Sequence, residues 1–215
     1  MEKHVFFDMD GTLVDPGEGI LSSLRYFLNK KKLPIPERAV MLSWIGPPLR
    51  LTFERYFGFN ERENDEAIAL FQEYYAARGV RECCLYEGIV PMLHRLRANG
   101  AFLAVATAKP EIYARAILED FGILSLFDRV TGADPREKTL FTKQDILAEA
   151  LSASAVCPEE TVYIGDRAAD MQAARNLKMK RIGVLYGFGT EEELRSAGAQ
   201  CCCRTVAELE GELLS

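Results

Sequence analysis

The chain has 215 residues, of which 48% are hydrophobic and 27% are charged, which is ordinary for a globular protein. This composition excludes disorder throughout the chain, collagen-like repeats and a coiled coil. The formal net charge is −6, which makes nucleic acid and anionic membranes poor candidates for partners. A phosphorylated small molecule remains possible, because a pocket can be locally positive in an acidic protein.

The chain shows no sign of a membrane segment or an export signal. Its longest apolar stretches, such as residues 101–108, are far shorter than the ~20 residues of a spanning helix. The N-terminus does not read as a signal peptide, so we expect a cytoplasmic protein. The six cysteines include no C-x-x-C pair, and we interpret them as reduced thiols that pack as small apolar residues.

The first predicted element is a short buried strand at residues 5–7, Val-Phe-Phe, which ends at Asp8. Proline and glycine then interrupt the chain, and residues 20–80 place apolar side chains at helical spacing without convincing strand alternation. We therefore predict that residues 16–87 form an inserted all-α domain.

Helices and strands alternate regularly after Gly88. The predicted elements are helix 89–99, strand 102–106, helix 111–120, strand 129–131, helix 140–151, strand 161–164, helix 168–177, strand 181–185, helix 191–197, strand 201–203 and a closing helix. Such alternation predicts a parallel sheet with helices on both faces. The fold class is thus α/β, a doubly wound, Rossmann-like sheet formed by residues 1–15 and 88–215.

Polar residues stand where the predicted strands end, which is the edge of a parallel sheet that binds ligands. They are Asp8, Asp10, Thr107, Asp166, Asp170 and a lysine near the start of helix 140–151.

This set of residues suits phosphoryl transfer. Asp8 follows its strand directly and can act as a nucleophile that forms an acyl phosphate. Asp10 can protonate the leaving oxygen and later deprotonate water, while Gly11 permits a turn that points N–H groups at a phosphate. Carboxylates this close repel one another unless a cation lies among them, and oxygen ligands favour Mg²⁺.

Three segments resemble motifs of the haloacid dehalogenase superfamily of phosphohydrolases. Asp8-Met9-Asp10-Gly11-Thr12-Leu13-Val14-Asp15 looks like its first motif, Thr107 at the end of Leu103-Ala104-Val105-Ala106-Thr107 is similar to its second, and Gly165-Asp166-Arg167-Ala168-Ala169-Asp170 resembles its fourth. The resemblance covers nearly the whole chain, including a helical cap after the first motif. It is strongest to the phosphoglycolate-phosphatase-like and nucleotidase-like branch.

The resemblance implies a role for each acid. Asp8 is the nucleophile and a Mg²⁺ ligand, and Asp10 is the acid/base whose backbone carbonyl also binds the metal. Asp166 ligates Mg²⁺, and Asp170 supports the metal site directly or through water.

The resemblance also implies a phosphate site made by Gly11, Thr107, Ala108 and the lysine of the third motif. Lys138 and Lys143 both lie in the right region, and we favour Lys143 because it precedes Gln144-Asp145-Ile146-Leu147 at a helix start. Lys109 lies near Thr107 but follows the second motif, so we do not count it as part of that motif.

Within the predicted cap, Gly46, Pro47 and Arg50 are candidates for substrate specificity. They lie in or beside a loop that precedes a cap helix. For Arg50, a solvated surface position is the competing interpretation.

We expect a Mg²⁺-dependent phosphatase acting on a small phosphorylated metabolite, such as phosphoglycolate, a sugar phosphate or a nucleoside monophosphate. A phosphomutase on the same scaffold is the alternative, and the presence of Asp10 argues against a dehalogenase. From other classes, a phospho-receiver domain and a catalytically silent binding protein remain as hypotheses.

Overall fold

The computed structural model describes residues 2–46, 48–133 and 142–215, and the chain forms two compact units. The core unit comprises Met1–Asp15 and Leu85–Ser215, and the inserted unit comprises Pro16–Cys84. The chain crosses from one to the other at β2 (Val14–Asp15) and β3 (Cys84–Leu85), which pair in a small sheet. These two strands escaped prediction because two residues are too few to show alternation.

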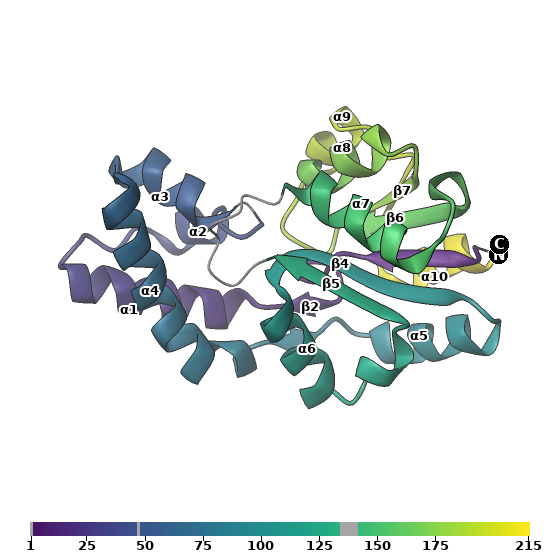
Figure 1. The fold of residues 1–215 in the computed structure, drawn as a ribbon, viewed down its shortest axis with the longest axis horizontal. Helices are drawn as coiled ribbons and strands as arrows, with labels where there is room; N and C mark the ends of the chain where they lie inside the picture. The colour runs from purple at the N-terminus through teal and green to yellow at the C-terminus, as the bar shows by residue number, and fades with distance from the viewer. Residues whose placement is uncertain (1, 47, 134–141) are drawn as a thin grey trace. The chain divides into compact units, whose positions relative to one another are not determined.

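The core unit contains one sheet of six strands in the order β5-β4-β1-β6-β7-β8, and all its strand pairs are parallel (Figure 1). The strands are β1 (His4–Phe7), β4 (Phe102–Pro110), β5 (Arg129–Ala133), β6 (Thr161–Gly165), β7 (Lys180–Val184) and β8 (Cys201–Cys203). The predicted doubly wound α/β fold is confirmed. The strand order reverses at β1, which is where such sheets bind ligands.

Helices cover both faces of this sheet. They are α5 (Ile89–Ala98), α6 (Glu111–Asp120), α7 (Lys143–Ser154), α8 (Ala168–Asn176), α9 (Glu191–Ser196) and α10 (Val206–Leu214), with short 3₁₀ turns at Leu124–Leu126 and Pro158–Glu160. Figure 1 shows α7, α8 and α9 on one face and α5 and α6 on the other. Between the sheet and helices α7 and α8, the buried core includes Phe6 of β1, Tyr163 of β6 and Leu147 of α7. The strands β1 and β6 are therefore buried and largely apolar, as expected for a parallel sheet.

The register of β1 places its end beside the end of β6 and beside the middle of β4. Phe7 pairs with Val105 of β4 and with Ile164 of β6. The next residue, Asp8, therefore stands beside the end of β6 and beside β4 just before its bulge. Its position follows from the parallel pairing and not from any contact that is local in sequence.

Strand β4 runs four residues further than predicted, to Pro110, because it contains a bulge. Thr107 pairs with Gly132 of β5, but Pro110 pairs with the very next residue, Ala133. The two extra residues of β4 are Ala108 and Lys109. Lys109 lies so close to Gly132 that a Cβ atom added there would be 2.6 Å from the Lys109 carbonyl oxygen. A glycine at this place is what lets the bulge lie close to β5.

Helix α7 begins at Lys143 instead of residue 140. Thr142 is its N-cap and forms a capping box with Asp145, in which each side chain accepts a hydrogen bond from the other residue's backbone N–H. Such a box defines where a helix starts. Residues 134–141, which include Lys138, lie outside the described residues.

The inserted unit is helical. Its helices are α1 (Gly17–Lys31), α2 (Arg38–Leu42), α3 (Leu49–Phe57) and α4 (Glu61–Ala77), followed by a 3₁₀ turn at Gly79–Arg81. Aromatic side chains pack in its interior, for example Phe27 against Phe53 with ring centroids 4.7 Å apart. This agrees with the aromatic helical pattern of the sequence.

In the described parts of both units, no helix combines the length and the apolar character needed to cross a membrane.

Candidate active site

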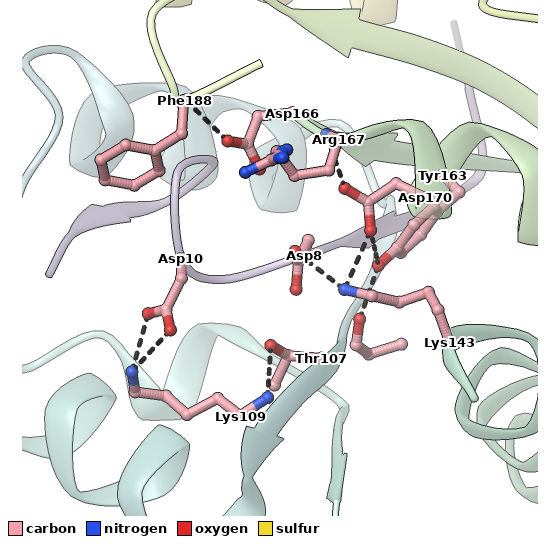
Figure 2. Close-up of polar contacts among 11 residues, drawn as sticks. Asp8, Asp10, Thr107, Lys109, Lys143, Tyr163, Asp166, Arg167, Asp170 and Phe188 are labelled. Atoms are coloured by element: carbon pink, nitrogen blue, oxygen red, sulfur yellow. Dashed lines mark hydrogen bonds and ion pairs between the residues drawn. The ribbon is translucent and has the colours of Figure 1, made fainter. Parts of the chain in front are cut away.

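Three buried carboxylates meet at the carboxyl edge of the sheet in the core unit. Asp8, Asp166 and Asp170 are all buried, and one oxygen atom from each lies within 4.8 Å of the others. Figure 2 shows the three side chains converging on one place. Because like charges this close repel one another out of water, the cluster needs compensating cations.

Each acid is held there by backbone structure. Asp8 leaves β1 with its N–H donating to the Ile164 carbonyl oxygen of β6 at 2.8 Å. Asp166 follows β6, and Asp170 lies one helical turn on, in the first turn of α8. A Cβ atom on Gly165 would lie 2.4 Å from Cβ of Asp170, so this close approach of α8 to β6 requires glycine.

Lys143 supplies one of the cations. Its Nζ lies 2.8 Å from Asp8 Oδ2 and 2.9 Å from Asp170 Oδ1, and its side chain is only 9% exposed. Burial alone would lower the pKa of Lys143, but the charges of Asp170 and Asp8 outweigh burial and raise that pKa above its usual value. Lys143 is therefore a permanent positive charge at neutral pH.

Both oxygens of Asp170 are engaged by protein donors. Oδ1 accepts from Lys143 and lies 3.5 Å from the Tyr163 hydroxyl, while Oδ2 accepts from the backbone N–H of Arg167 at 2.9 Å. The same Tyr163 hydroxyl donates to the Ala106 carbonyl oxygen at 2.7 Å. Asp170 thus connects α7 to β6 and, through Tyr163, to the middle of β4.

Asp8 and Asp166 differ from Asp170 in having one oxygen each without a donor. Asp8 Oδ1 and Asp166 Oδ1 are buried and have no hydrogen-bond partner among the described residues. A buried carboxylate oxygen left without a partner is costly. A hard divalent cation would satisfy both oxygens, so the donor set fits Mg²⁺.

A loop after β7 packs tightly against the acidic residues. Phe188 N–H donates to Asp166 Oδ2 at 2.8 Å, and the Tyr186 hydroxyl donates to the Thr12 carbonyl oxygen at 3.1 Å. A Cβ atom on Gly187 would lie 2.3 Å from the Gly11 carbonyl oxygen, and one on Gly189 would lie 1.9 Å from the Asp166 carbonyl oxygen. The loop therefore tolerates no side chain at either glycine.

Gly11 lies against both this loop and Asp166. Its φ of +79° is unfavourable for residues with a side chain, and a Cβ atom here would lie 2.1 Å from Asp166 Oδ2. The turn at Gly11 is thus dictated both by backbone conformation and by the nearby carboxylate.

Asp10 lies beside this cluster and pairs with a second lysine. Lys109 Nζ lies 2.8 Å from Oδ1 and 2.7 Å from Oδ2 of Asp10. Burial raises the pKa of Asp10, while the charge of Lys109 and its hydrogen bonds act in the opposite direction without cancelling the effect. Asp10 is therefore better prepared to hold a proton than an exposed aspartate is.

Thr107 ends the regular part of β4 and is 1% exposed. Its Oγ1 accepts a hydrogen bond from the backbone N–H of Lys109 at 3.2 Å. Because Oγ1 accepts this bond, its proton can point elsewhere, for instance toward a phosphate oxygen. Ala108, which is also assigned to phosphate binding, lies in the bulge directly after Thr107.

The specificity candidates lie in the inserted unit. Gly46 has φ of +110°, Pro47 lies outside the described residues, and the Arg50 guanidinium is bound to Asp65 of α4. Arg50 is thus already paired within its own unit, which the sequence did not reveal.

The sequence also missed Lys109, Tyr163 and Phe188 as neighbours of the acids. Lys109 lies two residues after Thr107, but the bulge in β4 sets the direction of its side chain, and no local sequence signal shows that bulge. Tyr163 looked like an ordinary strand residue, and Phe188 contributes only its backbone N–H.

Comparisons with known proteins identify the family of the chain. A family model described as haloacid dehalogenase-like hydrolase matches residues 5–184. A 5'-nucleotidase of Pseudomonas aeruginosa is 34% identical over 206 residues, which cover 96% of this chain and 93% of that protein. The resemblance inferred from the motifs is confirmed.

Two further similarities are informative. Tyrosine-protein kinase PtkA of Mycobacterium tuberculosis is 40% identical over 185 residues, which cover 86% of this chain but only 62% of that protein. The crystal structure of a predicted phosphatase from Clostridium acetobutylicum superposes with a TM-score of 0.95 at 36% identity, covering 100% of this chain and 99% of that one.

From the close packing of the three buried carboxylates we predict that the folded protein without metal loses stability as the pH rises. Burial, together with the charges of Asp170 and Asp8, holds the pKa of Asp166 well above its ordinary value. A group with a raised pKa in the folded state stabilises the fold most below its unfolded pKa of ~4 and loses that contribution as the pH rises. In chelator at pH 7, the free energy of unfolding of Asp166→Asn should therefore exceed that of the parent by at least ~1 kcal/mol.

Urea denaturation between pH 4 and pH 8 measures this difference, which should shrink toward the acidic end. Glu149→Gln, an exposed change on α7, is the matched control and should show no such trend. A parent more stable than Asp166→Asn at pH 7 would contradict the electrostatic account.

Proposed function

The chain belongs to the haloacid dehalogenase-like hydrolases, and we propose that it is a Mg²⁺-dependent phosphatase that cleaves a small phosphate monoester through an aspartyl phosphate. The observation that carries this proposal is the setting of Asp8. It stands at the end of the central strand, fixed by Lys143 on one oxygen, while its other oxygen has no donor among the described residues. A carboxylate held in this way is suited to attack a phosphorus atom.

In the first half of the reaction, an oxygen of Asp8 attacks the phosphorus atom and the bond from phosphorus to the ester oxygen breaks. The departing oxygen takes the proton of the Asp10 carboxyl group and leaves as an alcohol. The raised pKa of Asp10 supports this role, because a general acid must hold a proton near the working pH.

In the second half, a water molecule attacks the phosphorus atom of the aspartyl phosphate. Asp10, now a carboxylate, takes a proton from that water, and the bond between phosphorus and Asp8 breaks. Inorganic phosphate is released, and Asp8 and Asp10 return to their starting states. One residue thus serves first as acid and then as base.

Asp8 and Asp166 would hold the Mg²⁺ ion through their partnerless oxygens, with the Asp10 backbone carbonyl as a further ligand. Asp170 would support the ion indirectly, since protein donors engage both of its oxygens. When bound, the ion offsets negative charge and polarises a phosphate oxygen. Lys143 contributes a second positive charge on the other side of Asp8.

The transferred phosphate would be held by the Thr107 hydroxyl, the Ala108 N–H, Lys143 and the turn at Gly11. Hydrogen-bond donors fixed in advance stabilise the charge on the phosphoryl oxygens without reorganising during the reaction. Thr107 supports this assignment because its hydroxyl oxygen already accepts from Lys109 N–H.

The inserted unit, Pro16–Cys84, is proposed to act as a cap that limits the size of the leaving group. Gly46, Pro47 and Arg50 would contribute to that choice. The nucleotidase among the relatives favours a nucleoside monophosphate, and phosphoglycolate and sugar phosphates belong to the same size class.

A phosphomutase would use the same first half-reaction and pass the phosphoryl group to a sugar instead of water. The family membership removes the receiver-domain hypothesis, and the presence of Asp8, Asp10 and Lys143 disfavours a silent binding protein. The relative named as a tyrosine kinase makes phosphotyrosine a necessary substrate to test.

A screen of phosphate esters tests substrate class. The panel contains phosphoglycolate, a hexose phosphate, a nucleoside monophosphate, phenyl phosphate and a phosphotyrosine peptide whose leaving group matches phenyl phosphate. We expect inorganic phosphate from at least one small ester with kcat/KM at least ~10-fold above that for the peptide, because a cap discriminates by size. Equal turnover of the peptide would contradict the cap, and an isomerised sugar phosphate would indicate the mutase.

Asp8→Asn should lose at least ~10⁴-fold in kcat, since no other carboxylate can take over the nucleophilic role. The far-UV circular dichroism spectrum should stay unchanged. Acid-quenched parent enzyme should carry one phosphoryl group on the peptide that contains Asp8, as seen by mass spectrometry. Turnover by Asp8→Asn near the parental rate would exclude the covalent mechanism.

Removal of divalent cations should abolish turnover, and added Mg²⁺ should restore it. The carboxylate oxygens of Asp8 and Asp166 to which no described residue donates would otherwise repel the incoming phosphate. The measurement is the rate in excess chelator, with circular dichroism as a control for folding. Full activity in chelator would refute the metal site and leave the covalent mechanism to be judged on Asp8→Asn.

A further inference from the structure

Lys109 and Asp10 form a nearly buried ion pair beside the carboxylate cluster (Figure 2). The Lys109 side chain is 4% exposed and that of Asp10 is 18% exposed. Nζ contacts both carboxylate oxygens, at 2.8 and 2.7 Å, so the contact fixes the rotation of the carboxylate as well as its position. Among the described residues, no other hydrogen bond to the Asp10 carboxylate is found.

The bulge in β4 is what delivers Lys109 to this place. Lys109 is one of the two extra residues opposite Gly132 and Ala133, and a bulge changes the direction of the side chain it carries. The backbone of Lys109 is held on both sides, by its N–H bond to Thr107 and by its close approach to Gly132. Both the backbone and the ammonium group of Lys109 are therefore held by contacts.

The two buried lysines of the site serve different carboxylates. Lys143 contacts Asp8 and Asp170, whereas Lys109 contacts Asp10 (Figure 2). Asp10 sits in a turn next to Gly11, away from the rigid strand that holds Asp8, so its side chain has the greater need of an external support.

We propose that Lys109 is a positioning residue for Asp10, holding its carboxyl group where it exchanges protons with the leaving oxygen and with the attacking water. This inference rests on the proposed phosphatase function. Misplacing a catalytic group by about 1 Å can lower a rate by ~10²-fold, so a two-point contact to the acid/base is worth a comparable factor.

Two other roles for the pair give different results on mutation. A purely structural pair would affect all substrates equally when removed. If the ion pair instead held Asp10 away from the substrate, it would slow the reaction. Mutation of Lys109 would then not lower the rate.

The test compares two esters that differ in their need for a proton. The leaving group of 4-nitrophenyl phosphate departs as a stable anion, whereas an alkyl phosphate such as phosphoglycolate needs an acid. In Lys109→Met we expect kcat/KM for the alkyl ester to fall ~10²-fold, with less than ~10-fold loss for the aryl ester. The double variant Lys109→Met/Asp10→Asn should be no slower than Asp10→Asn alone, because the two residues act as one unit.

Lys180→Met is the matched control, since Lys180 also makes a two-point ion pair, with Glu2, but at the exposed start of β7. It should keep parental kcat/KM for both esters. Should Lys109→Met fail to fold, Gly132→Ala displaces the bulge without removing the charge and should show the same preference for the aryl ester.

Equal losses for both esters, additive losses in the double variant, or an unchanged rate would each overturn the positioning role. A parent enzyme that hydrolyses none of the phosphate esters of the substrate panel would instead overturn the proposed phosphatase function. That result is obtained before any variant is compared, so the two failures are distinguishable.

Discussion

The mutual repulsion of Asp8, Asp166 and Asp170 is the constraint on which the rest of the site depends. Their oxygens lie within 4.8 Å of one another in a buried setting, and one protein cation, Lys143, contacts two of the three. The backbone N–H groups of Arg167 and Phe188 each neutralise part of one carboxylate. Within the described part of the chain they leave one oxygen each on Asp8 and Asp166 without a donor, and a bound cation would offset this electrostatic deficit.

The parallel sheet meets this constraint by drawing its groups from distant segments. β1 and β6 end side by side next to the bulge of β4, and each of these three strands contributes a different polar group there. Rigid strands hold the groups close despite their repulsion, which flexible loops could not do. The repulsion between the carboxylates is thus confined to one edge of the sheet, and the apolar packing of the rest of the core offsets its cost in folding free energy.

The sequence predicted most of this arrangement because strand ends and helix starts are local signals. Asp8, Thr107, Asp166 and Lys143 stand at such points, and their order along the chain was enough to bring them to one edge. Lys109 only follows the second motif, and no local signal reveals its contact, since its partner lies 99 residues away and the bulge that aims it depends on Gly132 of another strand. Contacts made by backbone groups, such as Phe188 N–H, leave no trace in side-chain identity.

The position of β1 in the middle of the sheet affects how the protein is made. Its sheet neighbours β4 and β6 are both encoded far downstream, with the whole inserted unit between β1 and β4. At ~5–20 residues per second, the ribosome synthesises the first partner of β1 some 5–20 s after β1 itself. During that interval the apolar strand Val5-Phe6-Phe7 has no sheet to join, while the inserted unit, which has an aromatic core of its own, is being synthesised. The nascent chain therefore depends on keeping one short hydrophobic segment from aggregating until β4 is made.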